Sequence, residues 1–263
     1  MRLWIIKLGG SIITDKKSGK PAVLQDVITT ICTELADALA ASPDLRLVIL
    51  HGAGSVGHPL AHEYDLINKP LNPKRLIGMG KTMANMRRLT HVITKALHQL
   101  HLPALPLQAS SLGYMNEQGD FKLTGIRIIE TILKTGGIPV LAGDTVVTLS
   151  GNVAIASADT LAVALAQTLQ AQRILFFTDV DGVYDSFPPT DKTQLIPSLS
   201  RQEIEGSPSS AKVHATDVTG GMQGKLRALL PLQNIEVVIF NGVIPANIRA
   251  AFAEEAIGTT IRL

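Results

Sequence analysis

The stretch Leu45–His58, LRLVILHGAGSVGH, joins an apolar run to a loop made almost entirely of small residues. The run predicts a strand buried on both faces, because parallel strands covered by helices read as continuous aliphatic segments. Glycine lets backbone amides approach an anion closely, so the loop after the strand is a candidate anion-binding site. Two histidines, His51 and His58, frame this loop.

The same arrangement of an apolar run followed by a polar loop recurs along the chain. Runs at 3–6, 138–141 and 174–177 end in KLGGS, AGD and TDVDGVYD, and shorter runs lie at 105–107 and 237–240. Apolar residues at helical spacing separate these runs, at 27–39, 83–100 and 161–169. Alternating strands and helices predict an α/β fold with an open, largely parallel sheet. Ligands of such sheets bind beyond the carboxyl ends of the strands, so the four polar loops predict a shared cleft.

Local signals refine this outline. The turns NEQGD (116–120) and SGN (150–152) predict two hairpins, and Ser157 is placed to cap the helix that follows it. The stretch 186–210 is rich in Pro, Ser and Thr, which predicts a linker or a mobile surface segment. Gly80-Lys81-Thr82 is interpreted as a helix start.

Composition excludes several classes of protein. Hydrophobic residues make up 46% of the 263 residues and aromatics 4%, so the core is aliphatic. The net charge is +2 without a basic block, which argues against a nucleic-acid partner. A single cysteine, Cys32, excludes an internal disulfide and fits a reducing compartment. No window approaches the ~18 apolar residues of a membrane span, and the opening MRLWIIKLGGS reaches Lys7 too soon for a signal peptide. We therefore expect a soluble cytoplasmic protein with no membrane partner.

Two motifs resemble nucleotide fingerprints but lack essential parts. Gly52-x-Gly54-x-x-Gly57 follows a strand as in nicotinamide dinucleotide enzymes, yet the segment ~20 residues further on is basic and has no carboxylate for a ribose. A phosphate-binding Walker loop ending at Gly80-Lys81-Thr82 requires a glycine where Arg75 stands.

Three lysines lie on or beside glycine loops. Lys7 directly follows an apolar run, where an unpaired ammonium is costly to bury and a phosphate partner would offset that cost. Lys16 follows the amides of Gly9, Gly10 and Ser11, and Lys225 follows the pair Gly220 and Gly221. Cations on anion-binding loops suit phosphoryl transfer, whose catalysis is mainly positioning and charge neutralisation.

The motifs KLGGS, HGAGSVGH, AGD, FTDVDGVYD, TGGMQGK and the terminal GTTI stand in the order of the amino acid kinase superfamily, which the whole chain resembles. Within it, the second histidine of HGAGSVGH and the phrase LPALPLQASSLG (102–113) make the chain most similar to the isopentenyl phosphate kinases. The resemblance implies a three-layer α/β/α sandwich, one domain spanning 1–263, and commonly a homodimer. It also implies an acceptor-binding part at about 1–150, an ATP-binding part at about 151–263, and Mg²⁺-dependent transfer from ATP to isopentenyl phosphate in isoprenoid biosynthesis.

The resemblance also implies roles for particular residues. Lys7 would contact the transferring phosphate, Lys16 would stabilise the transition state, His58 would bind the acceptor phosphate and Lys225 would hold the nucleotide phosphates. The implied ATP site adds Gly9, Gly10, Ser11, Gly54, Asp179, Asp181, Tyr184, Gly220 and Gly221, and the implied acceptor site adds Ala53, Gly54 and Gly143. Ala53 and Val56 depart from the family pattern, but neither departure removes a catalytic group.

Several interpretations stay open at this stage. Met83 and Met86 line an apolar acceptor pocket or belong to a core stripe, since helical apolar spacing fits both. His51 is interpreted as structural, while Asp144 and Asp159 are candidates to organise the lysines or Mg²⁺. A fosfomycin-type antibiotic kinase and a non-catalytic nucleotide-binding relative are the alternative functions. The metal ligands and the length of the acceptor tail are not determined.

Overall fold

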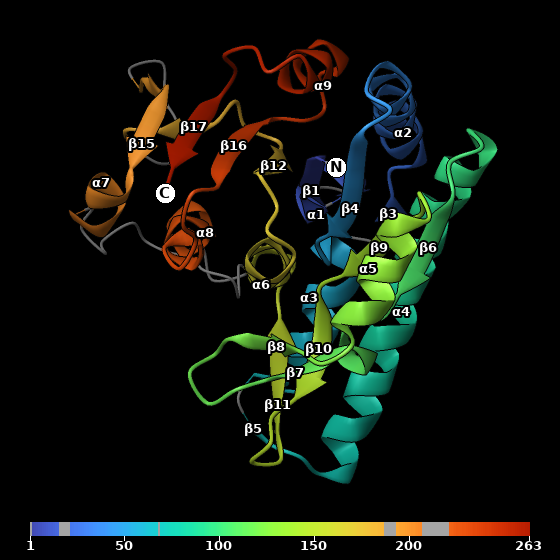
Figure 1. Ribbon diagram of the computed structural model, residues 1–263. Coiled ribbons are helices and arrows are strands. Elements are labelled where there is room, and N and C mark those ends of the chain that lie inside the picture. The colour runs from blue at the N-terminus through green and yellow to red at the C-terminus, as the bar shows by residue number, and fades with distance from the viewer. Residues whose placement is uncertain (1, 16–21, 68, 187–192, 207–220) are drawn as a thin grey trace.

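The computed structural model describes residues 2–15, 22–67, 69–186, 193–206 and 221–263 (Figure 1). Its largest element is a sheet formed by β1 (Arg2–Leu8), β4 (Leu45–His51), β6 (Ala104–Leu107), β9 (Ile138–Ala142), β12 (Arg173–Thr178), β15 (Ser198–Ser200), β16 (Glu236–Asn241) and β17 (Thr259–Arg262). The strand order is β15-β17-β16-β12-β1-β4-β9-β6. All neighbours are parallel except β16 and β17, which are antiparallel. The predicted open, mostly parallel sheet is confirmed.

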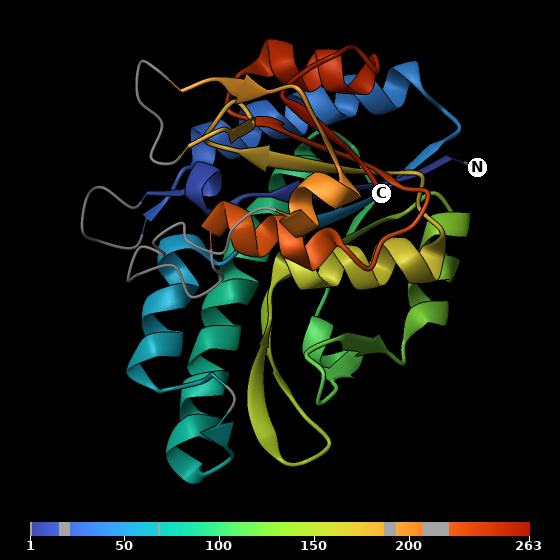
Figure 2. The same ribbon diagram turned by 90° about the vertical axis from the view of Figure 1, so that its left-hand side faces the viewer.

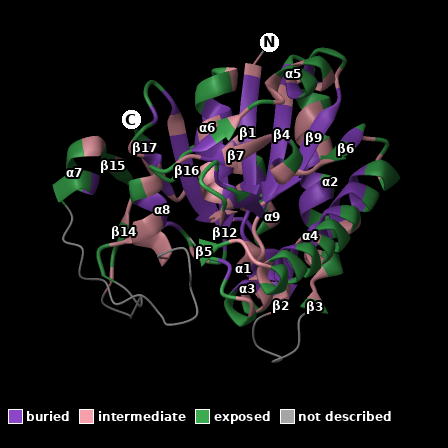
Figure 3. Ribbon diagram, turned by 90° about the horizontal axis from the view of Figure 1, so that it is seen from below, coloured by how far each residue is buried: buried purple, intermediate pink, exposed green. Residues whose placement is uncertain are grey.

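The centre of the sheet holds the strands that the glycine loops follow. β12, β1, β4 and β9 are consecutive neighbours and all run in one direction. Their carboxyl ends therefore lie at one edge, which brings KLGGS, HGAGSVGH, AGD and TDVDGVYD side by side. Buried strands occupy this centre in Figure 3, with exposed surfaces on the surrounding helices.

Helices cover both faces of the sheet. α2 (Gln25–Ala41), α4 (Pro73–Gln99) and α9 (Pro245–Phe252) share a buried cluster with one face. The other face packs against α5 (Ile126–Lys134), α6 (Ala158–Leu169), α7 (Arg201–Gly206) and α8 (Gly221–Leu229). This arrangement is the predicted three-layer sandwich.

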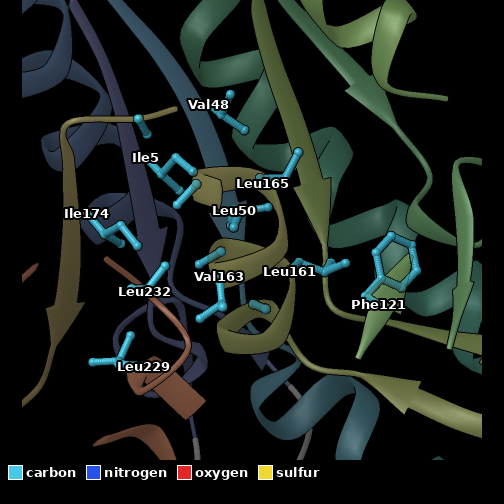
Figure 4. Packing of buried hydrophobic residues seen from close by; sticks show 14 of the residues in the cluster. Ile5, Val48, Leu50, Phe121, Leu161, Val163, Leu165, Ile174, Leu229 and Leu232 are labelled. Atoms are coloured by element: carbon cyan, nitrogen blue, oxygen red, sulfur yellow. The ribbon is translucent and has the colours of Figure 1, made fainter. Parts of the chain in front are cut away.

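The alternation of side chains along β1 decides which residue meets which helix layer. Trp4, Ile6 and Leu8 point to the α2 face, whereas Leu3 and Ile5 point to the α6 face. In Figure 4 Ile5 lies among the buried side chains of this second layer. Each fully buried aliphatic side chain contributes about 1.5–3 kcal/mol to folding, so the two faces fix the register of β1 firmly. By the same alternation, the side chain at position 7 points to the α6 face.

Smaller elements extend the fold beyond the layers. The predicted hairpins are confirmed as β7 (Gly113–Met115) with β8 (Phe121–Leu123), and β10 (Asp144–Val147) with β11 (Asn152–Ala156). The second hairpin and the helices α3 (Gly54–Glu63) and α4 project from the layered body (Figure 2). The remaining short elements are α1 (Gly10–Ile13), β2 (Thr14–Asp15), β3 (Ala22–Val23), β5 (Lys69–Pro70), the 3₁₀ turn η1 (Ala109–Ser111), β13 (Val183–Tyr184) and β14 (Leu195–Ile196).

The interpretation of Gly80-Lys81-Thr82 as a helix start is wrong. α4 begins at Pro73, where the Asn72 side chain accepts a hydrogen bond from Arg75 N at 2.8 Å. An asparagine cap followed by proline is a strong start signal, and it precedes the motif by two turns of helix. Lys81 therefore lies inside the helix, with Nζ 2.5 Å from the Tyr64 hydroxyl.

The composition of 186–210 predicts a linker or a mobile surface segment, but the described residues 193–206 form the short elements β14, β15 and α7. β15 joins the main sheet through β17, and α7 buries Ile204 against the α6 face. These elements are too short to carry a periodic signal, and they form because the sheet supplies their partners. No helix within the described ranges combines the length and apolarity needed to cross a membrane.

Candidate active site

A cavity of about 340 Å³ lies at the carboxyl edge of the four central strands. The loops after β1, β4, β9 and β12 all contribute to its wall, together with the first turns of α6 and α8. Predicted site residues that line it are Lys7, Gly9, Gly10, Ser11, Ala53, Gly54, His58, Met86, Gly143, Asp179, Gly221 and Lys225. The shared cleft predicted from the sequence is therefore present.

Glycine is required where the first two loops meet. Gly54 has a φ of +51°, a left-handed conformation that favours glycine. A β-carbon on Gly52 would lie 2.9 Å from Gly10 N, closer than side chains ordinarily approach backbone. Absence of side chains therefore lets the loops KLGGS and HGAGSVGH pack directly on each other beside the cavity.

Two lysines from distant parts of the chain converge on one carboxylate. Lys7 points to the α6 face, where its Nζ lies 3.0 Å from Asp159 Oδ1. Lys225, in the second turn of α8, places its Nζ 2.6 Å from Asp159 Oδ2. Asp159 sits in the first turn of α6, whose cap Ser157 accepts from Thr160 N at 3.0 Å. Asp159 therefore holds the two ammonium groups at a fixed separation on the cavity wall.

Burial and the close spacing of the charges shift the pKa values of this cluster. The side chains of Lys7, Asp159 and Lys225 are 11%, 13% and 10% exposed. Burial lowers the pKa of Lys225 to about 8, aided by the Lys7 ammonium and opposed by Asp159. Burial acts to raise the pKa of Asp159, but the two ammonium groups together hold it below its usual range. One carboxylate faces two lysines, so the cluster can attract a further anion when both lysines are protonated.

Asp159 was not among the predicted binding or catalytic residues, although the sequence made it a candidate to organise the lysines. Its position after the cap Ser157, in a first helical turn, was the available signal. Its contact with Lys225 spans 66 positions of the chain and had no local signature.

The HGAGSVGH loop and α4 form another part of the cavity wall. His58 lies in the second turn of α3, next to Gly57 at the cavity wall. Met86 lines the same cavity, whereas Met83 lines a neighbouring one. Ala61, Thr82 and Ile155 also line it and extend its wall with small or apolar groups. The lining of the cavity thus combines backbone amides and cations with small and apolar side chains.

The predicted nucleotide residues fall into two groups. Asp179 lines the cavity and accepts a hydrogen bond from Ser11 Oγ at 2.8 Å. Asp181 lies further along the loop after β12, where Tyr184 Oη and Asn241 Nδ2 donate to it at 3.0 and 3.1 Å. Neither Asp181 nor Tyr184 lines the cavity. The predicted residues Lys16 and Gly220 lie outside the described residues.

Two buried groups support the loops. His51 is fully buried, with Nδ1 3.2 Å from Gly52 O and Nε2 2.8 Å from Thr90 Oγ1, which confirms its structural interpretation. Burial lowers the pKa of His51 to about 4, against the raising effect of the Gly52 contact. Asp144 accepts from Ser110 N and Thr145 N at 3.1 and 2.9 Å, and burial raises its pKa. Asp144 therefore fixes loop backbone, and within the described residues no ion pair joins it to Lys7 or Lys225, which both pair with Asp159.

The sequence model of the amino acid kinase family matches residues 2–241. The chain belongs to the amino acid kinase family. Membership of a kinase family implies a phosphotransferase that uses ATP.

Two curated relatives and one solved structure are similar to this kinase over its whole length. An isopentenyl phosphate kinase of Methanothermobacter thermautotrophicus is 35% identical, with 98% of each chain covered. One of Methanocaldococcus jannaschii is 32% identical, again with 98% of each chain covered. A crystal structure described as isopentenyl phosphate kinase superposes with a TM-score of 0.84 at 31% identity, covering 99% of this chain and 100% of the other.

Proposed function

We propose that this kinase transfers the terminal phosphoryl group of ATP to isopentenyl phosphate, giving isopentenyl diphosphate and ADP. One observation carries the proposal: a single cavity is lined by the paired lysines, by His58 and by apolar side chains such as Met86 and Ile155. An acceptor with a phosphate head and a hydrocarbon tail matches that combination. The similar relatives named as isopentenyl phosphate kinases support the same acceptor.

The reaction requires two anions to approach each other. The attacking atom is a phosphate oxygen of the acceptor, so the site needs no strong general base. Lys7 and Lys225 reduce the repulsion by offering ammonium groups from one wall, and amides of the glycine loops add further donors. Asp159 holds both lysines in place, and its single charge leaves the cluster net positive. We propose that Lys16 joins them at the transferring group.

His58 supplies the contact with the acceptor phosphate in this proposal. It lies on the cavity wall beside Gly57. A phosphate dianion near an imidazole favours the protonated ring, so binding would raise the charge of His58 as the acceptor enters. Ala53 and Gly54 line the same cavity and can donate backbone amides, whereas the Gly143 amide, also at the cavity, already donates to His51 O at 3.0 Å.

Mg²⁺ fits the site as a companion of the nucleotide. Within the described ranges there is no group of three or more potential metal ligands, and Asp159 is already engaged by two lysines. Mg²⁺ commonly binds substrate phosphates with one or two carboxylates, and Asp179 is a carboxylate on the cavity wall. When bound, the ion would neutralise charge on the transferred group.

Each substrate is assigned to its own part of the chain in this proposal. We propose that the acceptor binds over the part formed by residues 1–150 and ATP over the part formed by 151–263, with Asp181 and Tyr184 shaping the nucleotide loop. A homodimer and a cytoplasmic location stay predictions. Light scattering would test whether the chain forms a dimer. The edge strand β6, where Leu105 is 40% exposed, is a candidate contact between the two copies.

A coupled ADP-release assay tests the acceptor directly. The purified chain is given ATP and Mg²⁺ with isopentenyl phosphate, fosfomycin, acetylglutamate or UMP in turn. We expect activity with isopentenyl phosphate. Activity restricted to one of the other three acceptors would overturn the proposal, and absence of activity with all four would favour a non-catalytic nucleotide-binding protein.

A further inference from the structure

The first turn of α3 is capped by a side chain from another loop. Helices begin with backbone amides that have no acceptor within the helix, and a capping side chain ordinarily supplies one. The capping position of α3 is Ala53, which has no side-chain acceptor. The amide of Ser55 donates instead to Thr14 Oγ1 at 3.0 Å. Thr14 lies on β2, 41 positions earlier in the chain, so the start of α3 depends on a residue outside the helix.

The same hydroxyl also holds the first glycine loop. Thr14 Oγ1 lies 2.7 Å from Gly10 O, and the hydroxyl donates this bond because a carbonyl oxygen can only accept. A threonine hydroxyl has one hydrogen to donate and lone pairs to accept, so it makes both bonds at once. One hydroxyl thus joins the KLGGS loop, at Gly10, to the HGAGSVGH loop, at Ser55.

The packing around Thr14 leaves its side chain little freedom. Thr14 is 1% exposed. A β-carbon placed on Gly54 would overlap Thr14 Oγ1 and lie 3.0 Å from Thr14 Cγ2, so the hydroxyl and the methyl group both pack against this glycine. A branched side chain is restricted at χ1, which keeps the hydroxyl directed at its two partners.

Thr14 stands behind the cavity wall. Gly10 and Gly54 line the cavity, whereas Thr14 is not among the residues that line it. In the proposed function the KLGGS loop belongs to the nucleotide site, and the HGAGSVGH loop carries His58, the proposed ligand of the acceptor phosphate. The Thr14 hydroxyl therefore fixes one loop relative to the other without touching either substrate.

We infer that Thr14 is a positioning residue, whose hydroxyl sets the separation of the two loops and so of the donor and acceptor phosphates. The inference rests on the proposed function and adds a residue that aligns its two substrates. Phosphoryl transfer depends mainly on positioning, and a misplacement of about 1 Å costs about 10²-fold in rate. Each loop keeps its own amides when the hydroxyl is lost, so the binding of either substrate is expected to change little.

The test measures kcat and both KM values with ATP and isopentenyl phosphate. Thr14→Val keeps the shape of the side chain and removes the hydroxyl. We expect kcat of this variant to fall by about 10–10²-fold, while the KM for ATP and the KM for isopentenyl phosphate stay near their wild-type values. Thr14→Ser restores the hydroxyl on a side chain with a freer χ1, and it is expected to recover most of kcat.

Thr94→Val is the matched control. Thr94 is 3% exposed, and its hydroxyl donates to Thr90 O at 3.0 Å within α4, so the variant loses a buried hydroxyl but no contact between loops. We expect it to keep the wild-type kcat. Urea unfolding in the assay buffer shows whether each variant is folded where its rates are measured, which separates a loss of stability from a loss of rate.

Three results would overturn the inference. The first is a folded Thr14→Val enzyme with the wild-type kcat. The second is an equal fall of kcat in Thr94→Val, and the third is a loss confined to the KM of one substrate, which would make the hydroxyl a support of one loop only. A Thr14→Ser enzyme as slow as Thr14→Val counts equally against the role of the hydroxyl.

A further variant covers the case in which Thr14→Val does not fold. Thr14→Ala removes the hydroxyl with a smaller side chain, and it is expected to show the same fall in kcat; the wild-type kcat there counts against the inference. Failure of the proposed function is distinguishable, because the wild type itself would then be inactive with isopentenyl phosphate.

Discussion

Replacing Asp159 with asparagine removes the carboxylate that joins Lys7 to Lys225 while keeping the size of the side chain. The two Nζ–carboxylate distances are 3.0 and 2.6 Å, and the three side chains are only 10–13% exposed. Two unit charges 4 Å apart attract by about 4 kcal/mol at an effective dielectric constant near 20. Desolvation offsets much of that attraction in the intact cluster, but the variant leaves two buried ammonium groups facing each other.

We expect Asp159→Asn to lower the free energy of unfolding by about 3–5 kcal/mol, the range observed when one partner of a buried pair is removed. Loss of preorganised charge is expected to lower kcat by about 10²-fold. The alkaline limb of kcat/KM for ATP should also move. Asp159 raises the pKa of Lys225, which is about 8 with the carboxylate present. Without this carboxylate the pKa of Lys225 falls, so Lys225 loses its proton at a lower pH. The enzyme therefore loses activity at a lower pH as well.

Urea unfolding measures the free energy of unfolding, and initial rates between pH 6 and 9 measure the alkaline limb of kcat/KM for ATP. Asp44→Asn is the matched control, because Asp44 pairs with Arg2 at 2.9 Å on the exposed surface, where we expect no comparable loss. An Asp159→Asn enzyme with wild-type stability and an unmoved alkaline limb would refute the role assigned to the carboxylate.

Three further predictions follow from single side chains. His58→Ala is expected to raise the acceptor KM sharply while His58→Gln keeps part of the affinity; unchanged acceptor KM and turnover in both variants would contradict its role. The pKa of His51 is about 4 in the folded protein against 6.5 when unfolded, so the unfolded state binds more protons between these values. The contribution of neutral His51 to stability should therefore be fully present above pH 6.5, and the free energy of unfolding should fall by about 3 kcal/mol as the pH drops to 4. The His51→Gln variant cannot titrate at this position, so its free energy of unfolding should depend less steeply on pH. An equal slope in the two proteins would count against the assignment. Ser157→Ala removes the acceptor for Thr160 N and should cost about 1 kcal/mol in urea unfolding, with no loss indicating that the cap is dispensable.

Much of the fold could be predicted because its signals are local. Continuous aliphatic runs such as 45–50 mark strands buried on both faces, and the turn SGN marks a hairpin. The start of α4 was placed too late, at Gly80, because the stronger start signal of Asn72-Pro73 precedes that glycine. Strand β15 and helix α7 had no usable signal, because elements of three and six residues depend on neighbours for their stability.

The sequence by itself determined the helical segments at 27–39, 83–100 and 161–169, the central strands and the glycine loops, and it predicted that Lys7, His58 and Lys225 bind phosphate groups. Tertiary structure alone decided that β12, β1, β4 and β9 are neighbours, that Asp159 joins Lys7 to Lys225, and that the Thr14 hydroxyl joins two glycine loops. The physical reason is distance along the chain. Periodicity and capping act over a few residues, whereas strand pairing and helix packing bring together groups as far apart as Asp159 and Lys225, 66 positions from each other.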